Sequence, residues 1–501
     1  MDFKIISKSL LCFLIVLSVC SCGTRGNKKD TAQTTLNKPN ILFIAVDDLR
    51  PELGSYGNTI IHSPNMDNLA SEGFVFTNHY VQVPTCGASR YSLLTGLRPT
   101  QKSHLSNNVF EREMANKSKF ENPESFVHQL KRNGYYTVGI GKISHSADGL
   151  VYGYEEQPSI IKEMPYSWDE FLFDSGKWET GWNAFFAYAN GENRQSLKKK
   201  VKPYEAGEVD DNGYPDGLTA DLAVSKLKEL KNKKQPFFLG VGFFKPHLPF
   251  NAPKKYWDIY NRSNMPLVPN PFVPKNVNKT SLHQSGEFNG YQLTDEKAGL
   301  SKPLSDEYSR KLIHAYYASI SYIDAQIGKV LDEVKALDLK ENTIVVIWGD
   351  HGWHLGNGLV WGKHTLFDVA LKSALIIKVP GKEVIGKKIK SVVESVDIYP
   401  TLMDLCGISI DYPLDGESLA NNLKNPDSIQ NNVAYSYFKN GISMRTDQYR
   451  LTKYWRKAEP TIEFYNHDTD PWETKNIADE NLDIVEELMP MLEKGNTGLY
   501  K

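Results

Sequence analysis

Charged and imidazole side chains follow four apolar runs of the sequence, at the point where each run ends. They are Asp47 and Asp48, Lys142 and His145, Lys245 to His247, and Asp350 and His351. Two adjacent carboxylates repel each other unless a cation lies between them, so Asp47 and Asp48 indicate a hard divalent metal ion. Taken alone, an Asp-Asp pair is more typical of a solvated loop. The metal hypothesis therefore depends on the other clusters lying nearby.

A single cysteine, Cys86, lies in a polar segment directly before residues 89–94, which a Thr-Gly pair ends. This pattern predicts that the cysteine stands where a short helix begins. A helix N-terminus with Arg90 close by favours negative charge, which suits either an activated thiolate or a bound oxyanion. The plain alternative is a small buried hydrophobic residue, which is the commoner role of a lone cysteine.

The apolar runs before these clusters are continuous, as in strands buried on both faces of a sheet. They cover residues 40–46, 136–141, 237–243, 343–348 and 374–379. Between them, residues 66–72 and 313–334 have apolar positions at helical spacing. Strands that alternate with helices predict an α/β fold with a mostly parallel sheet and helices on both sides. Ligands of such sheets bind beyond the carboxyl ends of the strands, where the four clusters fall.

The remaining segments give a domain organisation. Short aromatic segments at 433–438, 441–446, 449–455 and 462–468 are typical of antiparallel strands. We therefore predict a catalytic domain at residues 38–415 and a smaller α+β subdomain at residues 416–501. Residues 146–235 and 253–303 are rich in Gly, Pro, Asn and Trp, and are predicted to be long irregular loops around the mouth of the site.

The composition excludes several classes of protein. Lys and Arg number 58 against 60 Asp and Glu in 501 residues, so no basic excess indicates a nucleic-acid partner. A hydrophobic content of 40% and a charged content of 24% argue against disorder and against several membrane spans. Of the five cysteines, three lie in the first 22 residues, which argues against a disulfide framework.

The N-terminus predicts export. Residues 1–22 combine two lysines, an apolar run and the small Ser21 before Cys22, which is typical of a bacterial lipoprotein signal. A lipid on Cys22 would hold the protein on a membrane surface through that anchor alone, and polar residues 23–37 would be a flexible tether. An ordinary cleaved signal and a buried N-terminal helix are the alternatives. We expect a protein of the bacterial cell envelope that faces the periplasm or the cell surface.

The segment C-G-A-S-R at residues 86–90, followed by L-L-T-G, resembles the sulfatase signature, in which the cysteine is oxidised to formylglycine after translation. VDDLRPELGSYG, HSPNMDNLASEG, GIGKISH, FKPHLPF, WGDHGWHLG and WGKHTLFD follow that family's order. The Lys142 to His145 spacing is similar to the iduronate 2-sulfatase-like branch, and the resemblance runs from residue 38 to the end. It implies an alkaline-phosphatase-like sheet sandwiched by helices, with a smaller C-terminal α+β subdomain.

The resemblance also implies roles for individual residues. Cys86 would become the formylglycine through a maturation enzyme, and the hydrate of that group would attack sulfur. Arg90 would hold the hydrate and help to balance the charge of the metal site, and Lys142 and His145 would orient the hydrate and assist its breakdown. His247 and Lys363 would bind the sulfate and protonate or stabilise the leaving oxygen. The implied ligands of a calcium ion are Asp47, Asp48, Asp350, His351 and the modified Cys86.

Two positions depart from the commonest pattern of the family. Ala88 stands where proline is commonest, and His351 stands where many members have Asn. Calcium prefers oxygen ligands, so two interpretations of His351 stay open: it binds the ion directly, or it contacts the ligands of the ion.

The implied reaction is hydrolysis of a sulfate ester on a sulfated polysaccharide or its oligosaccharides. Cations near the sulfate and a proton donor near the leaving oxygen would lower its barrier. The substrate would be an algal polysaccharide such as ulvan or a glycosaminoglycan, with a uronic-acid 2-O-sulfate indicated by the branch. Two alternatives stay open: a phosphate or phosphonate ester hydrolase of the same superfamily, and a non-catalytic glycan-binding lipoprotein.

Overall fold

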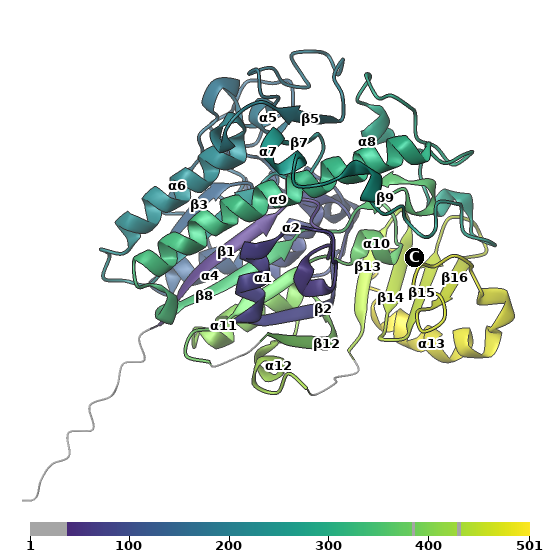
Figure 1. The fold of residues 1–501 in the computed structure, drawn as a ribbon. Coiled ribbons are helices and arrows are strands. Elements are labelled where there is room, and N and C mark those ends of the chain that lie inside the picture. Colours follow the sequence, from purple (N-terminus) through teal and green to yellow (C-terminus); the bar gives the residue numbers. More distant parts are fainter. Residues whose placement is uncertain (1–37, 383–385, 428–431, 501) are drawn as a thin grey trace, which may run out of the picture. The chain divides into compact units, whose positions relative to one another are not determined.

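A central eight-stranded sheet organises the computed structural model, which describes residues 38–382, 386–427 and 432–500 (Figure 1). Its strands lie in the order β12 (Lys387–Glu394), β2 (Phe74–Tyr80), β11 (Leu375–Lys378), β8 (Thr343–Gly349), β1 (Asn40–Val46), β6 (Phe237–Phe243), β3 (Tyr136–Gly141) and β4 (Glu170–Leu172). Strand β11 is antiparallel to β8 and β2, and the other pairings of this sheet are parallel. The predicted mostly parallel sheet is confirmed.

Strand β1 lies inside the sheet and sends side chains alternately into two cores. Leu42, Ile44 and Val46 pack on one face, and Ile41 and Phe43 pack on the other. All five are fully buried. Burying an aliphatic or aromatic side chain of this size is worth roughly 1.5–3 kcal/mol, so a strand in this position must be apolar throughout. Polar residues begin only where the strand leaves the sheet.

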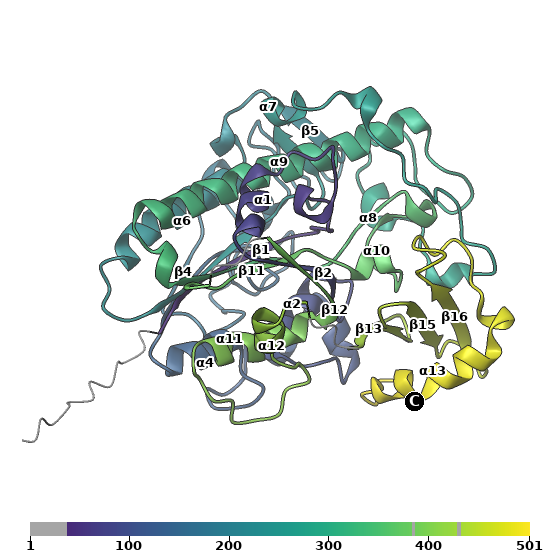
Figure 2. The same cartoon turned by 60° about the horizontal axis from the view of Figure 1, so that its bottom comes forward.

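Helices cover both faces of the sheet, as Figures 1 and 2 show. One face carries α1 (Pro64–Ser71), α6 (Pro215–Leu230) and α9 (Asp306–Ala336), and the other carries α2 (Cys86–Thr95), α4 (Phe126–Arg132) and α11 (Ile398–Leu405). In α9 the apolar stripe of the predicted helix, including Ile313, Ile320, Ile327 and Val334, is buried against the sheet. Residues 312–324 in the middle of this helix are buried on all sides, and its exposed charged residues lie toward the two ends.

Shorter elements lie in the connections. They are α3 (Val109–Glu113), α5 (Gly181–Phe185), α7 (Lys254–Trp257), α8 (Gly286–Asn289), α10 (Asp368–Leu371), α12 (Ala420–Lys424), and the strand pairs β5 (Tyr204–Gly207) with β7 (Phe250–Pro253) and β9 (His354–Leu355) with β10 (Trp361–Gly362).

The C-terminal part forms the antiparallel sheet that its aromatic segments predict. Strands β13 (Ala434–Phe438), β14 (Gly441–Arg445), β15 (Tyr449–Tyr454) and β16 (Thr461–Asn466) pair in chain order. Helix α13 (Leu482–Lys494) packs on one face through Val485 and Leu492. On the other face Tyr465 packs with Leu282 and Phe367 of the preceding part of the chain. The proposed boundary at residue 416 stays a prediction.

Two expectations about secondary structure need correction. Residues 215–230, inside the segment expected to be irregular, form helix α6. The helix begins at Pro215, and its buried residues include Ala220 and Ala223, small side chains that give a weak apolar pattern. Strands β2 and β12 were not anticipated, because polar residues interrupt their apolar positions.

The predicted lipoprotein signal, Cys22 and the tether at residues 23–37 lie outside the described residues. In the part of the chain that the structure covers, none of the helices combines the length and apolar character needed to cross a membrane.

The N-terminus of α1 depends on a carboxylate from another helix. Asp324 of α9 accepts hydrogen bonds from the backbone N–H groups of Asn65 (3.0 Å) and Met66 (2.8 Å), whereas Ser63 makes no side-chain capping bond to this helix. We expect Asp324→Ala to lower the free energy of unfolding by about 1–2 kcal/mol, because buried N–H groups lose their acceptor. Urea unfolding measures this. Asp332→Ala, at an exposed position of the same helix, is the control and is expected to change it by less than about 0.5 kcal/mol. Equal effects of the two substitutions would refute the capping role.

Candidate active site

Neighbouring strands deliver polar residues to one edge of the sheet. Strands β1 and β8 are parallel and Val46 pairs with Gly349, so Asp47 and Asp350 lie side by side just beyond the two strand ends. Lys142 follows β3 at the same edge, and its ammonium lies 3.0 Å from a carboxylate oxygen of Asp47. Clusters that are far apart in the sequence therefore meet at the carboxyl ends of the strands.

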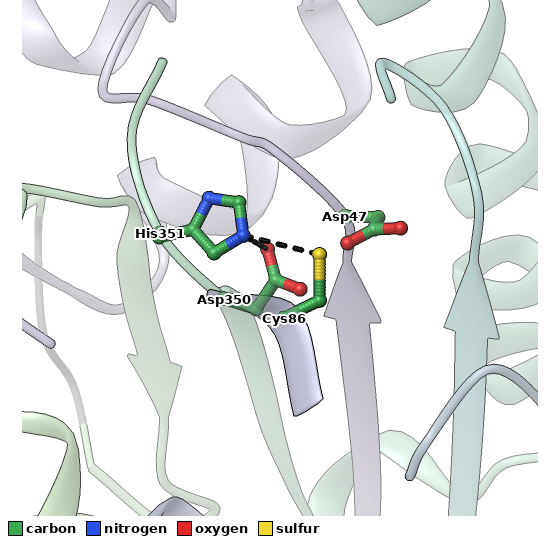
Figure 3. Close-up of side chains that lie close together, drawn as sticks. All are labelled: Asp47, Cys86, Asp350 and His351. Carbon is green, nitrogen blue, oxygen red and sulfur yellow. Dashed lines mark hydrogen bonds and ion pairs between the residues drawn. The ribbon is translucent and has the colours of Figure 1, made fainter. Parts of the chain in front are cut away.

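Cys86 is the first residue of α2, and its sulfur lies among Asp47, Asp350 and His351 (Figure 3). The sulfur is 3.2 Å from Nε2 of His351 and 3.3 Å from Nζ of Lys363. Burial, together with the charge of Asp47, raises the pKa of Cys86 to about 12. An unmodified thiol here is protonated near neutral pH, which disfavours the thiolate alternative.

Arg90 joins the two carboxylates at the strand ends. Its Nε donates to Asp350 at 2.9 Å, and its Nη2 lies 3.5 Å from Asp47. Its Nη1 donates to the backbone carbonyl of Lys142. Burial by itself would raise the pKa of Asp47, but Lys142, His247 and Arg90 together hold it well below its usual range. Asp47 is therefore ionised, although its side chain is completely buried.

Asp48 has a left-handed backbone conformation with φ 60°. For a residue other than glycine this conformation costs on the order of 1 kcal/mol or more. The backbone around it is fixed from both sides, since its N–H donates to Asp350 (2.9 Å) and its carbonyl accepts from the hydroxyl of Tyr316 (2.7 Å). This turn directs the two consecutive carboxylates to different cations. Asp48 contacts Lys363 at 3.0 Å, whereas Asp47 contacts Lys142.

His247 and Lys363 share a carboxylate that the sequence analysis missed. Glu287 of α8 lies 3.0 Å from Nε2 of His247 and 3.6 Å from Nζ of Lys363. Burial and the nearby Lys363 lower the pKa of His247 to about 4, so the ring is neutral at pH 7. Its Nδ1 lies 2.6 Å from the carbonyl oxygen of Leu248. A neutral imidazole carries one N–H group. His247 can therefore donate a hydrogen bond to the Glu287 carboxylate or to the Leu248 carbonyl oxygen, but not to both.

His145 opens onto a cavity of about 300 Å³. Burial, followed by the charge of Lys142, holds the pKa of His145 well below its usual range, and its Nδ1 is buried without a hydrogen-bond partner. The ring lies 5.2 Å from the ring of Trp182. The cavity is also lined by Asn107, Asn108, Glu111, Tyr152, Tyr154 and Glu163.

A divalent metal ion fits the donors of this cluster. Both carboxylate oxygens of Asp47 are buried, and each has one cationic contact, with Lys142 at 3.0 Å and with Arg90 at 3.5 Å, which leaves further lone pairs available. Asp47, Cys86, Asp350 and His351 offer ligand atoms that all lie within 4.8 Å of one another. The cluster's four carboxylates, now including Glu287, outnumber its three lysine and arginine side chains by one. Oxygen donors of this kind suit a hard cation.

The structure brings the sequence-predicted site residues together, and their individual roles stay predictions. The residues of this cluster are Asp47, Asp48, Cys86, Arg90, Lys142, His145, His247, Asp350, His351 and Lys363. Lys245 of the third polar cluster instead donates to the backbone carbonyls of His247 (3.0 Å) and Pro249 (2.8 Å), and so fixes the loop that carries the histidine.

Comparison with known families agrees with this geometry. The sulfatase family profile matches residues 39–408, and the profile of the N-sulphoglucosamine sulphohydrolase C-terminal region matches residues 349–497. The first match covers more than half of the chain and includes all ten predicted site residues.

Relatives of known name extend the match to most of the chain. A sulfatase of Formosa agariphila is 31% identical over 97% of this chain and 92% of its own length. The iduronate 2-sulfatase of Homo sapiens is 31% identical over 79% of this chain and 74% of its own length. A solved structure in complex with its substrate D-glucosamine-2-N,6-O-disulfate superposes with a TM-score of 0.68 at 20% identity, over 92% of this chain and 98% of that one.

The fold and the cluster thus define a hydrolase with an alkaline-phosphatase-like sheet and a smaller C-terminal sheet. The chain belongs to the sulfatase family, and its relatives place it with the iduronate 2-sulfatase-like branch. It is a sulfuric ester hydrolase, which sets aside a non-catalytic scaffold and a phosphate or phosphonate specialist.

We expect calcium to stabilise the folded protein and Asp47→Asn to remove that effect, because the substitution takes away an ionised ligand. Calcium at 100 times its Kd is expected to add about 2.7 kcal/mol, seen as a rise in Tm that EDTA reverses. Asp332→Asn is the matched control and is expected to keep the full rise. A wild-type Tm that does not respond to calcium would contradict the assignment of that ion.

Proposed function

We propose that this chain is a calcium-dependent sulfatase with a formylglycine at position 86, which releases sulfate from a sulfated glycan. The observation that carries the proposal is the place of Cys86. Its sulfur lies at the start of α2, 3.3 Å from the Lys363 ammonium and beside the carboxylates of Asp47 and Asp350. A residue at this point can attack an anionic group that the surrounding cations hold.

A formylglycine at position 86 would not need an ionised thiol, which burial disfavours at this position because it raises the pKa of Cys86. When present, a formylglycine supplies a hydrate oxygen as nucleophile toward sulfur, and a calcium ion withdraws charge from the sulfate oxygens. The aldehyde would be formed by a maturation enzyme before the protein is active. Cys86 is 3% exposed in the folded chain, so a maturation enzyme has little access to it there. This supports modification before the protein is active.

The side chains around position 86 divide the remaining work. Arg90 holds Asp47 and Asp350 in place, since it contacts both. Lys142, 3.0 Å from Asp47, keeps that carboxylate ionised and adds positive charge. His145 is neutral and has a free Nδ1, so it can accept a proton from a hydroxyl on residue 86.

On the other side of residue 86, Lys363 and His247 face the leaving oxygen. Burial opposes the charge of Lys363, but Asp48 and its other acidic neighbours raise its pKa well above the usual range, so it stays an ammonium ion. Negative charge that develops on the ester oxygen is stabilised by that cation. His247 adds an N–H donor at the same place when its Nε2 carries the proton.

Names of relatives support a sulfated saccharide as the substrate. The human relative is an iduronate 2-sulfatase, and an ulvan-active sulfatase of Formosa agariphila is 27% identical over 95% of this chain. We therefore infer a glycosaminoglycan or an ulvan-like polysaccharide, or oligosaccharides from them, with a uronic-acid 2-O-sulfate as the first candidate. A lipid on Cys22, in the bacterial envelope, would hold the enzyme where such chains enter the cell.

Cys86→Ala is expected to lower kcat for sulfate release by at least about 10³-fold while the fold persists, because the nucleophile is lost. Free sulfate from a panel of sulfated oligosaccharides is the readout. Mass spectrometry of the peptide that holds residue 86 is expected to show the aldehyde in active wild-type enzyme. Cys406→Ala, which changes the buried cysteine after α11, is the control and is expected to keep kcat. An unmodified thiol in fully active enzyme would overturn the mechanism.

A further inference from the structure

A row of aromatic side chains forms one wall of the site. The ring of His145 lies 5.2 Å from Trp182, Trp182 lies 4.6 Å from Tyr154, and Tyr154 lies 5.5 Å from Phe186. Phe186 in turn lies 6.4 Å from the ring of His247. The wall therefore runs from one predicted catalytic histidine to the other. Its middle belongs to residues 146–235, the segment predicted to surround the mouth of the site, in which Trp182 lies on helix α5.

Arg194 lies against this wall. Its guanidinium carbon is 3.5 Å from the centre of the Phe186 ring and 5.3 Å from that of Tyr291. One aromatic ring thus separates the guanidinium from His247. Burial raises the pKa of the Tyr154 and Tyr291 hydroxyls, and the charges of Arg194, Lys363 and Glu287 have smaller effects on both.

Arg194 has no acidic partner. It is 8% exposed, and among the residues that the structure describes no carboxylate lies within ion-pair distance of it. Its Nε donates a hydrogen bond to the neutral side-chain amide of Gln195, at 3.2 Å. The neighbouring Tyr291 hydroxyl is fully buried, and Arg194 lowers its pKa against the larger, raising effect of burial. A largely buried guanidinium without a counter-charge is costly, unless an anion binds to it in the working enzyme.

The backbone fixes this position. The N–H of Arg194 donates to the carbonyl of Phe186 (3.1 Å), and Tyr188 pairs with Glu192 (2.8 Å) in the same turn. The guanidinium is therefore held over the ring by the chain that also supplies the ring. A planar guanidinium that is placed in this way suits two-point contact with a carboxylate or a sulfate.

We propose that Arg194 determines substrate specificity by binding a second anionic group of the sugar, beyond the sulfate that is cleaved. The first candidate is the carboxylate of a uronic acid, and a second sulfate offers the same chemistry. The proposal rests on the proposed function, because it takes the sulfate to lie between Cys86 and Lys363. It gives the irregular loop around residue 194 a direct role in substrate choice.

The test compares wild type with Arg194→Gln on matched substrates. They are a disaccharide that ends in a 2-O-sulfated uronic acid, the methyl ester of that acid, and a neutral hexose with one sulfate or with two. We expect Arg194→Gln to lower kcat/KM roughly 10- to 100-fold for the doubly anionic compound that is the true substrate, mainly through KM. The matched compound that lacks the second anionic group, which is the methyl ester or the hexose with one sulfate, is expected to react equally fast with Arg194→Gln and with wild type. Loss on the acid identifies the carboxylate, and loss on the disulfated hexose identifies a second sulfate.

Two further variants separate binding from packing. Arg194→Lys keeps the charge and is expected to recover part of the loss, and Arg262→Gln removes an exposed arginine elsewhere and is expected to change nothing. An equal loss on charged and neutral substrates would show a packing role and overturn the proposal, as would no loss on any substrate.

A binding measurement covers the case in which wild type cleaves none of these compounds. The Kd of the sulfated uronic acid is measured for Cys86→Ala with and without Arg194→Gln, and a Kd that is equal in both, or no binding in either, overturns the role of Arg194. If Cys86→Ala still releases sulfate, the proposed function is wrong. This result differs from an unchanged Kd, which contradicts only the role of Arg194.

Discussion

The site depends on ionised groups that are held together away from water. Parallel pairing of β1 and β8 sets Asp47 beside Asp350, and two buried carboxylates repel each other strongly unless cations lie between them. Arg90 supplies the first of these cations and contacts both. The desolvation of such a cluster costs several kcal/mol per ion, so it persists only because each charge has a fixed partner.

Those partners come from separate elements, which explains why the fold is large. Arg90 lies on α2, Lys142 follows β3, and Lys363 follows β10. The sheet fixes the strand ends, helices on both faces fix the sheet, and the C-terminal sheet packs on the segment that carries Lys363 through Phe367 and Tyr465. A change in any of these layers would therefore move a charge relative to its partner.

Charges at the mouth of the site are paired differently from charges at its base. At the base each carboxylate is paired with a cation. On the aromatic wall, Arg194 has no acidic partner among the residues that the structure describes, and the cavity beside His145 is lined by aromatic and amide side chains together with Glu111 and Glu163. Paired charges hold the reacting group in one place, and an unpaired cation leaves an affinity for anions from outside the protein. The paired charges at the base are the part of the site to which we assign the reaction, and the wall is the part to which we assign the choice of substrate.

The sequence by itself determined the core strands, helix α9, the helix start at Cys86 and the residues at the base of the site. These follow from local patterns: continuous apolar runs, helical spacing, and a signature whose residues are close in the chain. The tertiary structure alone decided that Glu287 joins His247 to Lys363 and that Arg194 lies over Phe186. Neither residue has a local signal, because each acts through contacts between segments that only folding brings together. Helix α6 and strands β2 and β12 escaped prediction for a related reason, since their partners, and not their own apolar patterns, stabilise them.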